Sequence, residues 1–329
     1  MSDPLLPVHR RLGWSALVGL VVWAGLWGVP LGDGAEVLAL RLVLLAPLAL
    51  VPLLLDAAAT PDDAEDPALR VASWLLLPGA LAAAASLLVV TGPQAGALAA
   101  AWGLATLAVA AWGARRTVRL WRSDQLDAPE ATLGAGLVAL PGGAVWLGLA
   151  RAGLDPGPYG PLVVALTAAH FHYAASVAPL WAGLLGRRLV TNAPALRGPF
   201  VVCAGGLVAG TPLVATGIAL AGVPGGGTLI ETVGVVALTL GAMGLGLMGL
   251  AVVAHVPDRV GALMVGVSAA SLVVAMSLAL LFNVGPRVGI GMADLRWMLP
   301  RHGWLNAIGF GLWGAMGWRR LRQPTVAKR

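Results

Sequence analysis

The chain has 329 residues, of which 58% are hydrophobic and 11% charged, and its formal net charge is +6. A soluble domain carries about 25% charged residues, so most of this surface faces something other than water. The apolar runs are long and continuous, whereas a membrane β-barrel alternates over strands of about ten residues. Soluble domains and β-barrels are thereby excluded, and an all-α membrane protein is predicted. The basic residues lie in short loops between apolar runs, a pattern typical of membrane topology rather than of a nucleic-acid partner.

Ten apolar stretches follow one another, most of them near the length of about 20 residues that crosses the hydrocarbon of a bilayer. They lie near residues 12–30, 36–55, 71–91, 94–114, 132–150, 161–186, 199–222, 227–256, 260–285 and 302–318. Their order predicts a polytopic transmembrane helix bundle of about ten spanning helices, and residues 1–329 read as a single membrane domain. The single cysteine, Cys203, lies in one of these stretches and removes disulfides and thiolate clusters from consideration.

The distribution of lysine and arginine predicts the orientation of this bundle. With the N-terminus placed in the cytoplasm, 16 of the 21 basic residues fall in cytoplasmic segments, four fall outside and Arg41 lies within a span. Cytoplasmic loops carry such an excess, so both termini are expected inside, which requires an even number of spans. The longest outer segment, residues 286–301, mixes apolar side chains with Arg and Asp and is expected to lie along the membrane interface.

Few polar side chains interrupt the spans, and each is a candidate for function because a charge at the bilayer centre costs roughly 2.5–3.5 kcal/mol on insertion scales. The candidate ligand-binding residues are Arg41, His170, His172, Tyr173, Glu231, Asn283, His302 and Asn306. In the predicted topology they all fall in the outer half of the membrane, with His170 roughly 13–14 Å deep at 1.5 Å per residue. We therefore expect one polar pocket that opens outward.

Helix geometry limits what the two span-six histidines do together. His170 and His172 point about 200° apart on a helix of 3.6 residues per turn, so they cannot chelate one metal ion together. His170 shares a face with Tyr173. Any histidine-based site must therefore recruit other helices, for which Glu231 and His302 are the candidates, and Arg41 is a candidate ion-pair partner of Glu231. The alternative for each histidine is a hydrogen-bonded core residue, and for Arg41 and Glu231 a structural pair or a side chain that reaches the interface.

Two motifs carry a resemblance to a known family. Residues 166–174 read LTAAHFHYA and residues 302–310 read HGWLNAIGF. They resemble the LTAxHFHYA and HGxxNAxGF motifs of the YndJ-like family of bacterial integral membrane proteins. That family has no established biochemical activity, and some of its members carry a transporter label. The resemblance implies a location in the bacterial cytoplasmic membrane and joint action of His170, His172, Tyr173, Glu231, His302 and Asn306.

A second, local resemblance concerns a cofactor. The segment AHFHY at residues 169–173 is similar to the helix of haem–copper oxidases in which two histidines on opposite faces ligate two haems. The adjacent histidine pair and the His-x-x-x-Tyr motif of those oxidases are absent, and the chain holds five histidines in all. A full oxidase is therefore excluded, while a single haem held by His302 with His170 or His172 stays open.

Three functions remain after these exclusions. The first is a transporter or small-ligand-binding membrane protein that uses the outer pocket. The second is a membrane-embedded enzyme in which His170, His172, Glu231 or His302 supplies acid–base chemistry for an apolar or lipid-like substrate, although no nucleophile motif and no HExxH motif is present. The third is a haem- or metal-binding redox protein.

Overall fold

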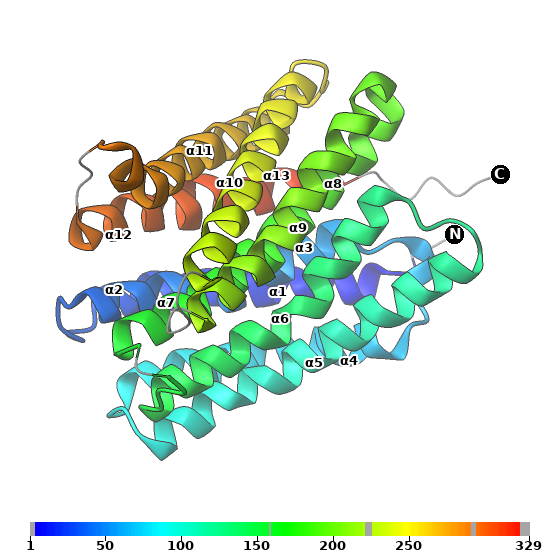
Figure 1. The fold of residues 1–329 in the computed structure, drawn as a ribbon. Coiled ribbons are helices and arrows are strands. Elements are labelled where there is room, and N and C mark those ends of the chain that lie inside the picture. Colours follow the sequence, from blue (N-terminus) through cyan, green and yellow to red (C-terminus); the bar gives the residue numbers. More distant parts are fainter. Residues whose placement is uncertain (1–3, 158, 221–225, 291–293, 323–329) are drawn as a thin grey trace.

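The computed structural model describes residues 4–157, 159–220, 226–290 and 294–322, and these residues form helices and connecting loops without any β-strand. Ten helical runs lie side by side. The beginning of the first run and the end of the last run lie at the same end of the bundle (Figure 1). Each run overlaps one of the ten predicted stretches. The prediction of an all-α, polytopic helix bundle is confirmed.

The first five helical runs pack as hairpins. They are α1 (Leu6–Leu26), α2 (Ala35–Leu45) continuing through η1 (Ala46–Leu50) into α3 (Val51–Ala58), α4 (Pro67–Ala85), α5 (Pro93–Arg122) and α6 (Ala128–Ala152). Short 3-10 turns, η2 (Pro61–Asp63) and η3 (Ser86–Leu88), lie in the connections. The helix α2–α3 is the most enclosed of the candidate spans, because other helices surround it on nearly all sides.

The remaining five runs complete the bundle. They are α7 (Pro161–His172) continuing through η4 (Tyr173–Val177) into α8 (Ala178–Asn192), α9 (Arg197–Ala219), α10 (Gly226–Val253), α11 (Arg259–Val284), and α12 (Leu295–Trp304) continuing through η7 (Leu305–Leu312) into α13 (Trp313–Arg320). The turns η5 (Pro194–Leu196) and η6 (Gly285–Val288) flank α9 and α11.

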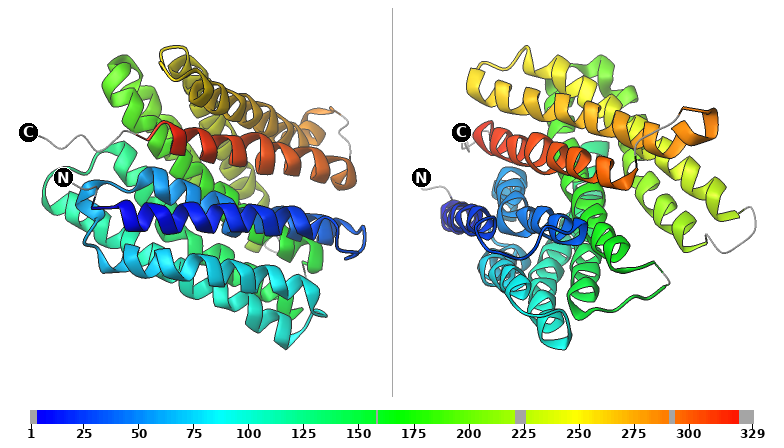
Figure 2. Two further views of the ribbon diagram at one scale, coloured as in Figure 1. Left: turned by 180° about the vertical axis from the view of Figure 1, so that it is seen from behind. Right: turned by 90° about the vertical axis from the view of Figure 1, so that its left-hand side faces the viewer.

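Among the described residues, eight helices are long and apolar enough to cross a membrane. The two other runs, α1 and α12–α13, carry arginines near their ends but run along the bundle beside the eight (Figure 2). Within the segment 286–301 the structure describes residues 286–290 and 294–301. Asp294 caps the first turn of α12 by accepting from the amide of Trp297, so much of this segment belongs to the last helix.

An ion-pair network joins helix ends at the end of the bundle where α1 begins and α13 ends. Asp56, at the end of α3, pairs with His9 of α1 and, at 2.6 and 2.8 Å, with Arg319 and Arg322 at the end of α13. The beginning and the end of the described chain therefore meet, as an even number of crossings requires. This is the end where the sequence places most of its arginines.

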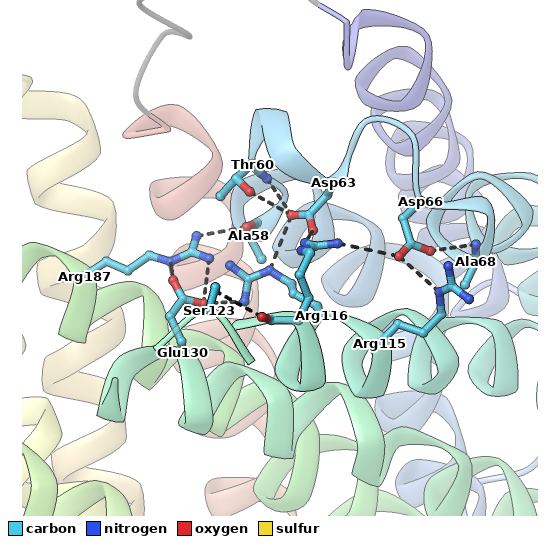
Figure 3. Close-up of polar contacts among 11 residues, drawn as sticks. Ala58, Thr60, Asp63, Asp66, Ala68, Arg115, Arg116, Ser123, Glu130 and Arg187 are labelled. Atoms are coloured by element: carbon cyan, nitrogen blue, oxygen red, sulfur yellow. Dashed lines mark hydrogen bonds and ion pairs between the residues drawn. The ribbon is translucent and has the colours of Figure 1, made fainter. Parts of the chain in front are cut away.

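A second ion-pair network at the same end of the bundle joins four helices (Figure 3). Arg116 and Arg119 of α5 pair with Asp63, and Arg116 also pairs with Glu130 of α6. Arg187 of α8 pairs with Glu130 at 2.8 Å and donates to the carbonyl of Ala58 at the end of α3. Each buried carboxylate thus has cationic partners, which satisfies the requirement for burying charge.

Glycine allows α9 and α10 to approach each other closely. A Cβ atom on Gly210 would lie 2.6 Å from the amide nitrogen of Leu238, and one on Gly217 would lie 2.3 Å from that of Glu231. Helices in lipid associate through such small-residue contacts because no hydrophobic difference separates a helix surface from the lipid. The close pairing positions the first turns of α10, including Glu231, against α9.

Three helical runs contain π-helical segments, and the three segments pack against one another inside the bundle. They are η1, η4 and η7. Isolated π segments are rare in α-helices and are frequent at functional sites. Tyr173 of η4 and Asn306 and Phe310 of η7 also line the cavity described below.

Candidate functional site

A cavity of about 340 Å³ lies between α2 and α7 on one side and α9, α10 and α11 on the other, with α12 and η7 bordering it. Most of its wall is aliphatic or aromatic, with residues such as Leu207, Met276 and Phe282. The polar residues in the wall are His170, Tyr173, Glu231, Thr239, Asn283, His302 and Asn306. Glu231 lies near the beginning of α10 and Asn283 at the end of α11, so the cavity lies toward the end of the bundle opposite the ion-pair network.

The carboxylate of Glu231 is held by an amide from the neighbouring helix. Asn283 Nδ2 donates to Glu231 Oε1 at 2.9 Å, and Asn283 Oδ1 accepts from Arg287 at 3.0 Å. The exposed Arg287 is thus joined to the half-buried Glu231 through an amide rather than by direct contact. This arrangement fixes the carboxylate at the cavity wall and leaves its second oxygen, Oε2, without a hydrogen-bond donor among the described residues.

Each of the two cavity histidines, His170 and His302, is held by a hydrogen bond from its Nδ1 atom to a backbone carbonyl. His170 Nδ1 lies 2.8 Å from the carbonyl of Leu166, and His302 Nδ1 lies 3.0 Å from the carbonyl of Ala275. A carbonyl oxygen only accepts, so Nδ1 is the donor in each ring, and the neutral imidazole carries its lone pair on Nε2. Within the described part of the chain neither Nε2 atom has a hydrogen-bond partner. Both rings are therefore fixed in tautomer and orientation, with Nε2 left for another molecule.

Tyr173 and Asn306 stand at the first turns of two π segments. Tyr173 donates its hydroxyl to the carbonyl of Leu42 at 2.8 Å, which ties η4 to α2 across the cavity floor. Asn306 Nδ2 donates to the carbonyl of His302 at 2.8 Å. The altered backbone pairing of a π segment leaves carbonyls to be satisfied by side chains, and Asn306 does so within its own helix.

Two of the eight residues singled out from the sequence, Arg41 and His172, do not line this cavity. Arg41 donates to the carbonyl of Val29 at 2.7 Å and places its guanidinium 5.1 Å from the ring of Trp27. The ion pair between Arg41 and Glu231 that the sequence allowed is not among the contacts of the described residues. Arg41 instead closes the connection between α1 and α2.

His172 is a buried structural residue. Its Nδ1 lies 2.8 Å from the carbonyl of Ala168, and its Nε2 accepts from the indole of Trp102 on α5 at 3.0 Å. Both ring nitrogens are engaged, so His172 has no lone pair left for a haem iron or another metal. Of the two haem arrangements drawn from the sequence, the one that uses His172 does not fit this geometry. Among the described residues no group of three or more His, Cys, Asp and Glu side chains is placed to hold a metal ion.

Sequence reasoning missed two features of the site. Thr239, whose hydroxyl bonds to the carbonyl of Val235 at 2.7 Å, lines the cavity but resembles any threonine in an apolar span. The π segments were also unforeseen. For two of them a signal in the sequence is proline, since Pro47 lies inside η1 and Pro179 lies two residues after η4, and proline removes a backbone donor from a helix.

These features define a class of protein: a polytopic α-helical membrane protein with a mainly apolar cavity that is edged by a few fixed polar groups. The family model for YndJ-like proteins matches residues 41–310, and the chain belongs to this family. Its motifs provide His170, Tyr173 and His302 of the cavity. Membership shows an integral, multi-pass membrane protein.

One relative is the uncharacterized membrane protein YndJ of Bacillus subtilis (strain 168). It is 28% identical over 206 residues, which cover 61% of this chain and 35% of the relative. The match therefore spans about a third of the relative's length. No solved structure matches the chain.

Proposed function

We propose that this protein binds a small, mainly apolar ligand in the cavity between α2, α7 and α9–α11, as a transporter or ligand-binding protein of the bacterial cytoplasmic membrane. One observation carries the proposal: an apolar cavity of about 340 Å³ to which α7, α10, α11 and α12 each bring a polar side chain. Small-molecule sites have this composition, with mainly apolar walls and a few placed polar groups in roughly 300–1,000 Å³.

Energetics support a functional rather than a structural role for these groups. Polar side chains inside a membrane protein are costly and are retained mostly where they pair or line a pathway. The lone pairs on the Nε2 atoms of His170 and His302 have no partner among the described residues, although a plain helix bundle would satisfy or omit such groups. A ligand that pairs with them removes this cost.

Identification of the bound molecule tests the proposal. The protein is purified in native-membrane nanodiscs, and the bound molecules are extracted and compared by mass spectrometry with those of two variants. Ala279→Phe fills the cavity, whereas Ala100→Phe adds the same ring on the exposed side of α5. We expect one compound enriched with the wild-type protein and Ala100→Phe and lost in Ala279→Phe. Equal lipid content in all three preparations would contradict the proposal.

A second function is favoured by the anchored imidazoles. A histidine whose Nδ1 is fixed by a carbonyl and whose Nε2 is unengaged suits general-base catalysis on a bound substrate. The cavity would then belong to a membrane-embedded enzyme that acts on an apolar or lipid-like molecule. Incubation of the co-purified compound with fresh protein distinguishes the two: a transporter returns it unchanged, whereas an enzyme converts it at a rate that His170→Ala abolishes.

A further inference from the structure

The two hydroxyl groups in the described cavity wall, those of Tyr173 and Thr239, both donate their hydrogens to backbone carbonyls. Tyr173 gives its O–H to the carbonyl of Leu42, and Thr239 gives its O–H to the carbonyl of Val235. Each hydroxyl has one hydrogen to donate and two lone pairs, so what remains at both oxygens is acceptor capacity.

The nitrogen-bearing side chains follow the same pattern. The imidazoles of His170 and His302 direct their Nδ1–H groups to carbonyls, which leaves Nε2 of each neutral ring as an acceptor. Asn306 uses Nδ2 to donate to the carbonyl of His302, and its Oδ1 remains an acceptor. Among the described side chains of the wall, the donors that remain are the second amide hydrogens of Asn306 and Asn283.

The formal charge in the cavity wall is negative. Glu231 is the charged residue among the described residues that line the cavity, and neither lysine nor arginine is among them. The nearest cation in its hydrogen-bond chain, Arg287, is exposed and reaches the carboxylate through Asn283. A ligand in this cavity therefore meets one carboxylate and a set of lone pairs.

We propose that the ligand is an amphiphile with a cationic, hydrogen-bond-donating head, such as a protonated amine, on a compact apolar body. This inference rests on the proposed function and names its ligand class. An alkylammonium has up to three N–H donors and a positive charge, which match Glu231 and the Nε2 atoms of His170 and His302. Its hydrocarbon body matches the aliphatic remainder of the wall.

Other head groups fit this wall poorly. A phosphate or carboxylate head would place its charge beside Glu231 without a cationic side chain in the wall, and like charges at such range repel strongly when water is scarce. A ketone or quinone head offers acceptors to a wall whose remaining side-chain donors are the second amide hydrogens of Asn283 and Asn306, so its lone pairs would face the carboxylate and imidazole lone pairs unpaired. A bare metal ion lacks a group of three ligating carboxylates or imidazoles among the described residues.

Three probes with the same ten-carbon chain separate the head group from the body: decylamine, which is protonated at pH 7, decanol and decanoate. Each is titrated into protein in phosphatidylcholine nanodiscs, and the rise in unfolding temperature is followed by tryptophan fluorescence. The shift seen with the cavity-filled variant Ala279→Phe is subtracted, because it reports partitioning into the lipid. The variant Glu231→Gln keeps an oxygen acceptor for Asn283 but removes the charge, and Glu36→Gln is the matched control at a half-buried glutamate outside this cavity.

We expect decylammonium to bind the wild-type protein and Glu36→Gln alike, and to bind Glu231→Gln about tenfold or more weakly, as loss of a charge-assisted hydrogen bond implies. Decanol should bind the wild-type protein and Glu231→Gln equally, which also shows that the variant is folded. Equal binding of all three probes to the wild-type protein would overturn the head-group inference and leave the apolar site standing. Failure of all three probes to bind above the Ala279→Phe background would overturn the proposed function as well.

Discussion

The indole of Trp102 donates to Nε2 of His172 across 3.0 Å, and this bond joins α5 to α7 on the side of α7 that faces away from the cavity. His170, two residues earlier, exposes its ring to the cavity instead. The two histidines of one motif therefore have different roles: one maintains packing and one serves the site.

Replacement of each histidine separates these roles. His172→Ala removes a fully buried ring and leaves an unpaired indole, so we expect a loss of about 2 kcal/mol or more in the free energy of unfolding, most of it from the packing defect. His170→Ala should change this free energy by less than about 1 kcal/mol, because its ring borders a cavity. Unfolding in mixed detergent micelles measures both. A larger loss for His170→Ala than for His172→Ala would show that His170 is a core residue.

The contact between α9 and α10 provides a test of packing. Gly210→Ala places a methyl group 2.6 Å from the amide nitrogen of Leu238 and 2.8 Å from the carbonyl of Gly234, so the helices must separate. We expect a loss of roughly 1–3 kcal/mol, the usual cost of overpacking. Gly205→Ala, on the same helix with no atom within 4 Å, is the control and should be neutral or stabilising. The helix contact would be disproved if both variants unfolded like the wild-type protein.

Asp63 makes stability depend on pH. Burial acts to raise the pKa of its carboxyl, but the charge of Arg116 and hydrogen bonds from Thr60 and Arg119 outweigh it and hold the pKa below the usual value. A carboxyl with a lowered pKa stabilises the folded state above its unfolded pKa of about 4, and this contribution is lost as pH falls through the folded value.

We therefore expect Asp63→Asn to cost roughly 3 kcal/mol at pH 7, as for one partner removed from a buried pair, and the difference from wild type to shrink toward pH 3. Unfolding temperatures between pH 7 and pH 3 measure this convergence. Asp62→Asn, at the exposed neighbouring position, should follow the wild-type curve throughout. A difference for Asp63→Asn that stays constant with pH would contradict the assignment.

The orientation of the bundle is testable with single cysteines, because Cys203 is the one native cysteine. In a Cys203→Ser background, Val288→Cys lies near the cavity end and Gln125→Cys lies in the loop between α5 and α6, both at exposed positions. The charge distribution predicts that a membrane-impermeant maleimide labels position 288 in intact cells and labels position 125 only after permeabilisation. The reverse pattern would place the cavity on the cytoplasmic side.

Hydropathy and spacing predicted the number and order of the helices but misplaced some of their ends. The fourth stretch was expected to end near residue 114, whereas α5 continues to Arg122. Its last turns carry arginines that hydropathy excludes, and their pairing with Asp63, Asp66 and Glu130 stabilises them. These partners come from the connection between α3 and α4 and from the first turn of α6, so no local window of sequence reveals them.

The position of a residue along its helix was more predictable than the direction in which its side chain points around the helix. Charge counting placed all eight polar residues toward one end, and six of them line one cavity. The spacing of His170 and His172 predicted opposite faces but not which face meets the cavity. Arg41 turned toward Trp27 and the carbonyl of Val29 because a nearer partner satisfied it within the first hairpin. These choices depend on tertiary packing, which periodicity does not encode.

The most direct test of the account is an electron cryomicroscopy map of the protein in native-membrane nanodiscs, inspected between Glu231 and His302. The account predicts a density outside the polypeptide that fills the cavity, with one end within hydrogen-bonding distance of Glu231 Oε2 or of Nε2 of His170 or His302. A closed space, with these side chains hydrogen-bonded to one another and α10 packed onto α7, would contradict it.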